Sequence, residues 1–260
     1  MSERDNELRP GATRRLLGAL IQSAILLMLA PIASRAAVPD LSGIWIPDDK
    51  RDQPLQPPAV PFTGAAKVLF DQFDKRTRDS SAYCMPFGTP RNVLGTAAYP
   101  LEIIQQPKRI TMLFSPLNDV RKIYMDGRPH PQDVIPTWMG HSVGQWDADA
   151  LVVDTVSMTG ESILNDSGLP HSEQMQVSER FSLLNDRGMK FLQVEIKITD
   201  PQFYSQPLHA TRYFRWAPDA PLPQGSVGCL IDQRRASLEA NYRALFHKLQ
   251  GVKNPGEKQP

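Results

Sequence analysis

The sequence predicts a mainly β protein, a single antiparallel β-barrel or strongly curved sheet with an N-terminal and a C-terminal helix. Strand-like runs recur from Tyr99 to Trp216 and are separated by short turns. The clearest pattern is a hairpin within Pro136–Thr155, whose two halves flank the turn residues Asp147–Ala150. Roughly eight or nine such strands, with no repeat or low-complexity linker between them, favour one domain.

The first 36 residues of the 260-residue chain resemble a secretory signal peptide. Basic residues precede an apolar run from Leu16 to Ala33, and Ser34-Arg35-Ala36 places small residues at the cleavage positions. We expect a mature domain of residues 37–260 that is periplasmic or secreted. An uncleaved anchor is the alternative, and Thr13–Leu17 loosely resembles a twin-arginine export signal.

The charge of the mature chain argues against two classes of partner. Of the 29 basic and 28 acidic residues, 24 and 25 lie after position 36. A nearly neutral protein has no basic footprint for nucleic acid or for an anionic membrane surface. We therefore expect no nucleic-acid partner and, after signal cleavage, no membrane partner, and we leave a homo-oligomer open.

Two cysteines, Cys84 and Cys229, lie in the exported part. In an oxidising compartment an isolated pair is most simply a disulfide. A catalytic thiol is the alternative, but no histidine-containing motif accompanies either residue.

Helices are predicted on both sides of the strands. The first spans residues 64–78, with Thr63 as its N-cap and with Val68 and Leu69 on its apolar face. The second spans residues 236–250 and ends before Gly251. The predicted strands between them are residues 101–105, 109–115, 120–125, 143–146, 151–154, 175–184, 189–199 and 209–216.

Glu179 is the most unusual side chain in the strand pattern. It shares parity with Val177 and Phe181, so it should point into the barrel with them. Burial would raise the pKa of this carboxyl and prepare it for acid–base chemistry. The alternative is an internal ion pair with an arginine of a neighbouring strand.

Three histidines stand at predicted strand ends: His130, His141 and His171. If they converge at one barrel mouth, His141 and His171 can move protons while Glu179 or Asp166 assists them. A metal site of imidazoles and a carboxylate is the alternative, but the spacings of 11 and 30 residues match no short metal motif, so no metal is predicted. Each histidine can also simply cap a loop.

Substrate-binding candidates are aromatic and cationic. Aromatic side chains can line a pocket for an apolar or aromatic ligand, although they can equally be core residues. An arginine can bind an oxyanion. The candidates are Trp138, Trp146, Tyr124, Arg128 and Arg180.

Several motifs carry a resemblance to known proteins. Gly43-Ile44-Trp45 resembles the start of lipocalin-type barrels, in which the Trp plugs one end. Residues 40–45, 123–131, 137–142, 151–155, 168–172 and 179–181 resemble a mostly uncharacterised family of exported bacterial proteins with the motif TWMGHS-x-G-x-W-x-G-D-x-L-V-V-D-T. The likeness covers about residues 40–216.

The chain departs from that family at two places. Ala148-Asp149-Ala150 replaces a Gly-Asp turn, and Gly228–Asp232 lacks the usual acidic and His residues around the last cysteine. The resemblance implies an exported domain that handles small molecules, and His141 and His171 are the polar residues that its motifs single out.

The leading hypothesis is an exported enzyme of the lyase, isomerase or hydrolase type. It would use cofactor-free acid–base chemistry on a small hydrophobic or aromatic molecule, with His141 and His171 as base and acid. The alternative is a periplasmic carrier that binds such a ligand without turnover. A third hypothesis is a His-ligated metal enzyme.

Overall fold

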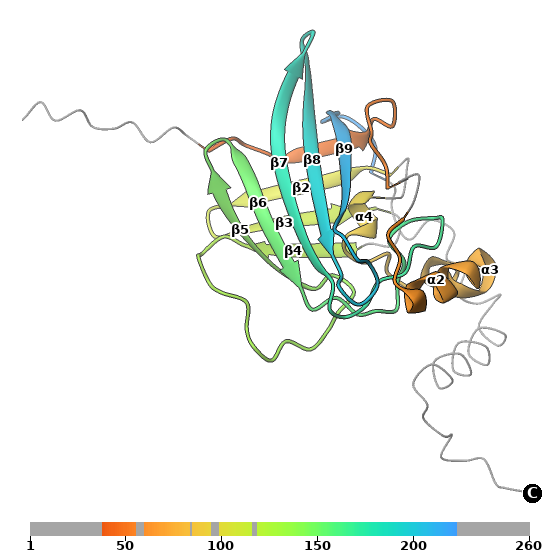
Figure 1. The fold of residues 1–260 in the computed structure, drawn as a ribbon. Coiled ribbons are helices and arrows are strands. Elements are labelled where there is room, and N and C mark those ends of the chain that lie inside the picture. The colour runs from red at the N-terminus through yellow and green to blue at the C-terminus, as the bar shows by residue number, and fades with distance from the viewer. Residues whose placement is uncertain (1–37, 56–59, 84, 95–98, 116–118, 223–260) are drawn as a thin grey trace, which may run out of the picture. The chain divides into compact units, whose positions relative to one another are not determined.

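The computed structural model describes residues 38–55, 60–83, 85–94, 99–115 and 119–222. Within them, nine strands close into a barrel in chain order around the ring (Figure 1). The fold class predicted from the alternating strand pattern is therefore confirmed. The strands are β1 (Gly43–Pro47), β2 (Leu101–Gln106), β3 (Arg109–Phe114), β4 (Asp119–Tyr124), β5 (His141–Asp147), β6 (Ala150–Val156), β7 (Gln176–Asp186), β8 (Met189–Thr199) and β9 (Leu208–Trp216).

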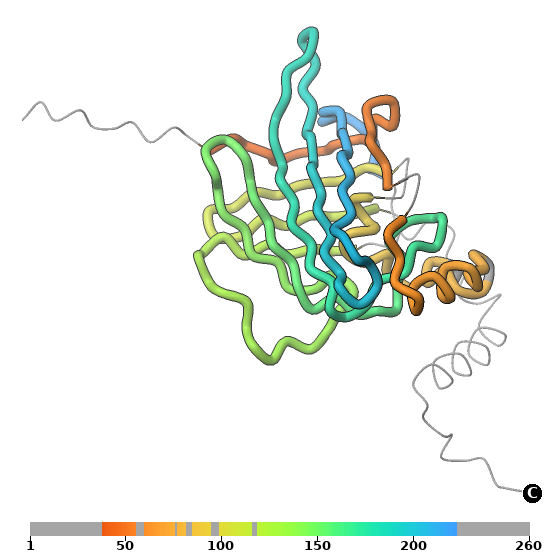
Figure 2. Tube along the Cα trace, in the orientation of Figure 1, coloured from red at the N-terminus to blue at the C-terminus, as the bar shows by residue number. Residues whose placement is uncertain are grey.

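The helical segments of the described residues lie between β1 and β2 along the chain. They are α2 (Gly64–Asp71), α3 (Lys75–Arg78), the 3₁₀ turn η1 (Ser80–Tyr83) and α4 (Arg91–Leu94). Figure 2 shows the chain leaving the barrel after β1 to form α2 and α3 beside it. None of the helices in the described part of the chain has the length and hydropathy needed to span a membrane.

The β4–β5 pair departs from the predicted antiparallel order. These two strands run parallel and share the partners Ile123–Ser142 and Tyr124–Val143, whereas the other neighbouring pairs in the described barrel are antiparallel. Around a closed ring, an odd number of strands cannot alternate in direction throughout, so at least one parallel pair is required. Because parallel neighbours need a long connection, the chain crosses from β4 to β5 by the loop 125–140.

The barrel interior is filled by side chains of one parity from each strand. Trp45 is fully buried, its indole N–H donates to Leu41 O at 2.9 Å, and its ring packs edge-on to Trp216 at 5.0 Å. Gly43, at φ 120°, is required here because a Cβ would lie 2.2 Å from the Trp216 ring. The Gly-x-Trp segment thus lets β1 join β2 and β9 and close the barrel.

The predicted helix of residues 64–78 is broken after α2. Thr63 is the N-cap residue, but its hydroxyl donates to Gln202 O at 2.8 Å instead of capping the helix. Val68 is 54% exposed, so the predicted apolar face is wrong. The helix stops where the Phe73 ring lies against Gly168, at a position that a Cβ on Gly168 would occupy.

Some predictions lie outside the described residues. These are the signal peptide of residues 1–36, both partners of the predicted disulfide, Cys84 and Cys229, and the helix of residues 236–250. They stay predictions.

Candidate functional site

Two histidines meet on the outer face of the barrel. Ser142 is buried and points inward, so His141, the residue before it on β5, points outward. Gly140 allows this start of the strand, because at φ 66° it lies so close to β6 that a Cβ would be 2.6 Å from Val156 O. The loop 125–140 brings His130 against His141, so the crossover that the barrel requires also builds the site.

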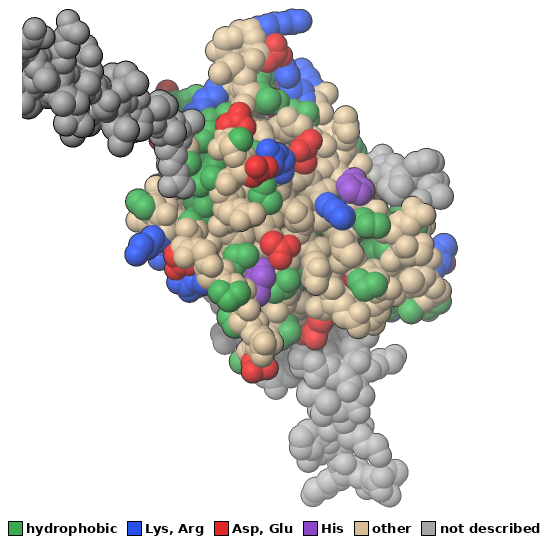
Figure 3. Space-filling model, turned by 60° about the vertical axis from the view of Figure 1, so that its left-hand side comes forward, with side chains coloured by type: hydrophobic (Ala, Val, Ile, Leu, Met, Phe, Trp, Pro, Cys, Tyr) green, Lys and Arg blue, Asp and Glu red, His purple; other side chains and the backbone are tan. Residues whose placement is uncertain are grey.

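The outer histidine cluster consists of Tyr124, Arg128, His130, His141 and Asp154. The two histidine Nδ1 atoms are 2.8 Å apart, and His130 Nε2 lies 3.1 Å from Asp154 Oδ2. The Tyr124 ring stacks on His141 with a centroid distance of 5.2 Å. Figure 3, which turns the β5 and β6 side of Figure 1 toward the reader, shows histidine at the surface beside acidic and hydrophobic side chains.

The hydrogen bonds assign the tautomers of both rings. A carboxylate only accepts, so His130 donates its Nε2 hydrogen to Asp154 and keeps a lone pair at Nδ1. His141 then donates Nδ1–H to that lone pair, which leaves a lone pair on its own Nε2. Within the described residues, no hydrogen bond occupies His141 Nε2.

The charge environment keeps His141 neutral. Partial burial lowers the pKa of His141, and the positive charge of Arg128, together with that of His130 when this ring takes up a proton, lowers it further. At neutral pH the ring is therefore in its basic form. Its free nitrogen can accept a proton.

Arg128 adds a cation to the same surface. Its guanidinium lies 4.1 Å from the centroid of the Tyr124 ring and pairs with Asp126. Hydrogen bonds from Arg128 lower the pKa of the Asp126 carboxyl to about 2, so this pair stays ionised. Arg128 is 47% exposed and can still reach an anionic group in solution.

Glu179 lies inside the barrel, as its parity predicted, and forms an ion pair. Arg121 of β4 meets both carboxylate oxygens, with Nη1 at 3.0 Å from Oε1 and Nη2 on Oε2. Arg121 also donates from Nε to Ser142 at 3.1 Å and from Nη2 to Thr155 at 2.7 Å. We call Arg121, Ser142, Thr155 and Glu179 the inner ion-pair network; its two charged side chains are 0% exposed.

His171 is buried away from the outer histidine cluster. Its Nε2 lies 2.7 Å from Ser162 Oγ and its Nδ1 lies 3.3 Å from Ser172 O. Burial lowers the pKa of His171 to about 4, so the ring is neutral. No hydrogen bond or ring contact in the described part of the chain joins His171 to His130 or His141.

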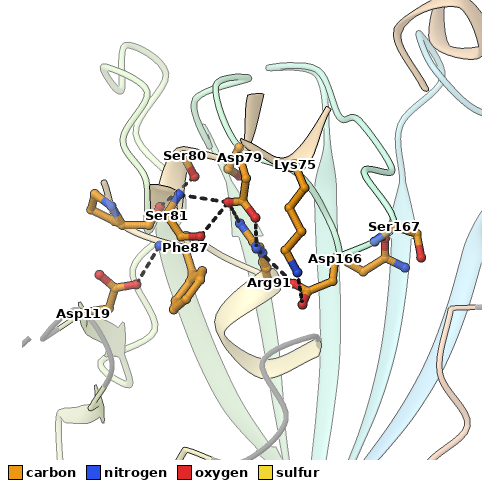
Figure 4. Close-up of polar contacts among 12 residues, drawn as sticks. Lys75, Asp79, Ser80, Ser81, Phe87, Arg91, Asp119, Asp166 and Ser167 are labelled. Atoms are coloured by element: carbon orange, nitrogen blue, oxygen red, sulfur yellow. Dashed lines mark hydrogen bonds and ion pairs between the residues drawn. The ribbon is translucent and has the colours of Figure 1, made fainter. Parts of the chain in front are cut away.

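Asp166 belongs to an ionic cluster beside the helical segments (Figure 4). Its Oδ1 accepts from Arg91 at 3.0 Å, and its Oδ2 accepts from Lys75 at 2.9 Å. Arg91 is buried and forms two hydrogen bonds with Asp79, at 2.7 and 2.8 Å. These contacts tie α3 and α4 to the loop before β7.

The remaining predicted binding residues are dispersed. Trp138 lies at the end of the loop 125–140 and its carbonyl accepts from Thr89 N at 2.9 Å. Trp146 is partly buried against the core. Arg180 lies on the outer face of β7 and forms an exposed ion pair with Asp147 at 2.7 Å.

A cavity of about 450 Å³ lies between residues 53–55, Pro61 and residues 206–211 at the start of β9. None of the predicted site residues lines it. Across the described ranges, no group of three or more His, Cys, Asp or Glu side chains is arranged to hold a metal ion.

Sequence reasoning missed the partners that complete both clusters. Asp154 alternates with Val153 and Thr155, and this parity could have placed it on the outer face beside His141. Arg121 shares parity with Ile123, and the same reasoning could have named it as the inward partner of Glu179. His130 stands at a predicted strand end, but its position depends on a loop whose path no periodicity predicts.

No protein-family model matches this chain, and no curated protein is similar to it at a significant level.

Proposed function

We propose that this protein is an exported enzyme that performs cofactor-free acid–base chemistry on a small aromatic or hydrophobic molecule, with His141 as the general base. The observation that carries the proposal is the chain Asp154–His130–His141, with contacts of 3.1 and 2.8 Å, which ends in an unoccupied imidazole nitrogen at the surface. A base held in one tautomer by a second group is the arrangement that proton abstraction needs.

The surroundings support an aromatic substrate that carries a partial or full negative charge. The Tyr124 ring offers an apolar face beside His141, and Arg128 offers a positive charge close to that ring. An oxyanion or enolate that develops as His141 takes a proton would be stabilised by this cation. His130 and Asp154 would act as positioning residues, because they touch His141 rather than the substrate.

We propose roles for these residues that differ from those the sequence suggested. Glu179 and Asp166 are held by Arg121 and by Arg91 with Lys75, so neither assists His141. His171 has its own buried partner in Ser162. The proposed reaction therefore uses the outer histidine cluster alone.

Membership in the exported family with the Thr137–Ser142 motif is part of the same proposal. The ordered sequence motifs support it, and the β-barrel is compatible with the lipocalin-like resemblance. Export is supported by the basic and apolar pattern of residues 1–36.

A comparison of His141→Gln with His209→Gln tests the proposal. His209 is exposed on β9 outside the cluster, so its variant is a matched control. Turnover would be measured on a panel of small aromatic esters, enolisable ketones and hydroxy compounds. We expect kcat/KM to fall by about 10²- to 10⁴-fold in the first variant only.

A pH profile separates a positioning role of His130 from a structural one. Activity requires neutral His141, so kcat/KM should rise with pH through a pKa below the ordinary value of 6.5. Protonated His130 repels a proton on His141 and so lowers the pKa of His141, and His130→Gln should therefore move the rise to higher pH. Equal turnover in wild type and His141→Gln would contradict the assignment, and ligand binding without turnover would favour the carrier.

A further inference from the structure

We infer that the Nδ1 atoms of His130 and His141 form a two-imidazole binding site for a divalent copper ion. Two ring nitrogens only 2.8 Å apart cannot both present lone pairs to each other, so something positive must lie between them. In the metal-free protein this is the hydrogen on His141 Nδ1. A metal ion bound by both lone pairs is the other arrangement that satisfies them.

The separation of the two nitrogens selects the metal geometry. Imidazole–metal bonds are about 2.0–2.1 Å long, so a nitrogen–nitrogen distance of 2.8 Å gives an angle of about 86° at the ion. Neighbouring positions of a square-planar or tetragonal site require about 90°, which suits Cu²⁺. A tetrahedral zinc site would require the nitrogens about 3.3 Å apart. Both rings need only turn until their lone pairs point at the ion.

Asp154 supplies the outer support that such a site needs. Its Oδ2 accepts from His130 Nε2 at 3.1 Å, which fixes Nδ1 as the nitrogen free for a metal. A carboxylate behind a ligating histidine also orients the ring and increases its basicity. The Asp154 charge favours a cation, and the charge of Arg128 is offset by its ion pair with Asp126.

The site leaves coordination positions open. His130 is 21% exposed and Asp154 is 50% exposed, so the ion would face solvent. With two protein ligands, the remaining positions would hold water or an anionic molecule. This arrangement fits a reversible ion more closely than a buried structural metal.

Copper binding would also change which ring nitrogen of His141 carries the hydrogen. Coordination through Nδ1 moves the hydrogen of the neutral ring to Nε2, and the pair releases no net proton. His141 Nε2 then becomes a donor and can no longer act as a base. The expected inhibition by copper rests on the proposed function. The existence of the copper site does not rest on it.

The test uses the untagged protein and Cu²⁺ alone, without substrate. Electron paramagnetic resonance should show one copper ion with two equatorial nitrogen donors, and calorimetry should give its affinity. His130→Gln and His141→Gln should each weaken binding at least tenfold and remove the two-nitrogen signature, and His209→Gln should change neither. Asp154→Ala should weaken binding about tenfold, because the outer-shell partner is lost.

Each outcome decides between the arrangements. The absence of copper binding by wild type, or copper binding by either histidine variant that is as tight as in wild type, overturns the site. Zinc bound more tightly than copper overturns the geometry derived from the 2.8 Å separation. Circular dichroism checks that each variant is folded. Because His130 lies on a loop outside the strands, His130→Gln still tests the site if His141→Gln does not fold.

The same measurements separate this inference from the proposed function. If His141→Gln loses turnover but wild type binds no copper, only the metal site fails. If copper binds through both histidines while His141→Gln keeps full turnover, only the acid–base assignment fails.

Discussion

The inner ion-pair network and the outer histidine cluster share two strands, β5 and β6, whose adjacent residues point to opposite faces. Ser142 and Thr155 point inward to Arg121, while their neighbours His141 and Asp154 point outward. Inside, the carboxylate, the guanidinium and both hydroxyls have partners among the four residues. Outside, the hydrogen-bonded chain ends at one free nitrogen.

This difference distinguishes a structural polar cluster from a functional one. A buried charged pair is stable only when its hydrogen-bonding groups are satisfied, so it has no capacity left for a ligand. An exposed cluster can leave one group without a partner at little cost, because water satisfies that group. Substitutions inside should therefore reduce stability, whereas substitutions outside should change binding and turnover.

The largest effect is expected for Glu179→Ala. It leaves the Arg121 charge buried at 0% exposure without its carboxylate, and such a loss costs about 3–5 kcal/mol of unfolding free energy. Urea unfolding followed by circular dichroism would measure it.

The double variant Arg121→Met/Glu179→Leu is the control for this prediction. Since apolar residues of similar size can replace a buried ion pair, most of the lost stability should return. A Glu179→Ala protein as stable as wild type would mean that the charges are not desolvated.

A smaller effect is expected from the pH dependence of His171. Its pKa is about 4 in the folded protein and 6.5 when unfolded, so between these values the unfolded chain binds the proton and the folded chain does not. Stability should therefore decrease as the pH falls from about 6.5 to 4. The shift corresponds to about 3 kcal/mol.

His171→Gln isolates this contribution from that of the carboxyl groups. The stability of wild type minus that of the variant, measured by urea unfolding at each pH, should shrink by about 3 kcal/mol between pH 7 and pH 4. A difference that stays constant over this range would show that His171 is protonated or exposed in the folded state.

The strand pattern predicted much of this fold, because each strand has one buried and one exposed face. The alternation around Glu179 placed it inside and allowed for an arginine partner, and Arg121 is that partner. Alternation carries no information on strand direction. The parallel β4–β5 pair therefore could not be anticipated from it.

The candidate site was harder to predict for the same reason. Convergence of the three histidines depends on the paths of loops, and these paths depend on tertiary contacts that no local sequence period records. The structure brings His130 to His141 but leaves His171 with Ser162. Parity could also have indicated that His141 points outward, since Ser142 follows it on a strand whose inner face contains buried residues.

The smallest effects test the two faces of β6 directly, through neighbouring residues. Thr155→Val keeps the shape but removes a hydroxyl that accepts from Arg121 at 2.7 Å, so about 1–2 kcal/mol of unfolding free energy should be lost. Asp154→Ala removes an exposed carboxylate, and because exposed ion pairs contribute little, the loss should stay below about 1 kcal/mol.

The histidine tautomers should respond more to Asp154→Ala than to Thr155→Val, which is the reverse of the order expected for stability. In ¹⁵N spectra of the histidine rings, Asp154→Ala should release His130 from its single Nε2–H form, because its acceptor is gone. Thr155→Val should leave those signals unchanged, since its side chain lies on the other face of the strand. If Asp154→Ala instead destabilises the protein more than Thr155→Val, Asp154 is part of the structural framework. The separation between a structural interior and a functional exterior then fails at the residue that orients His130.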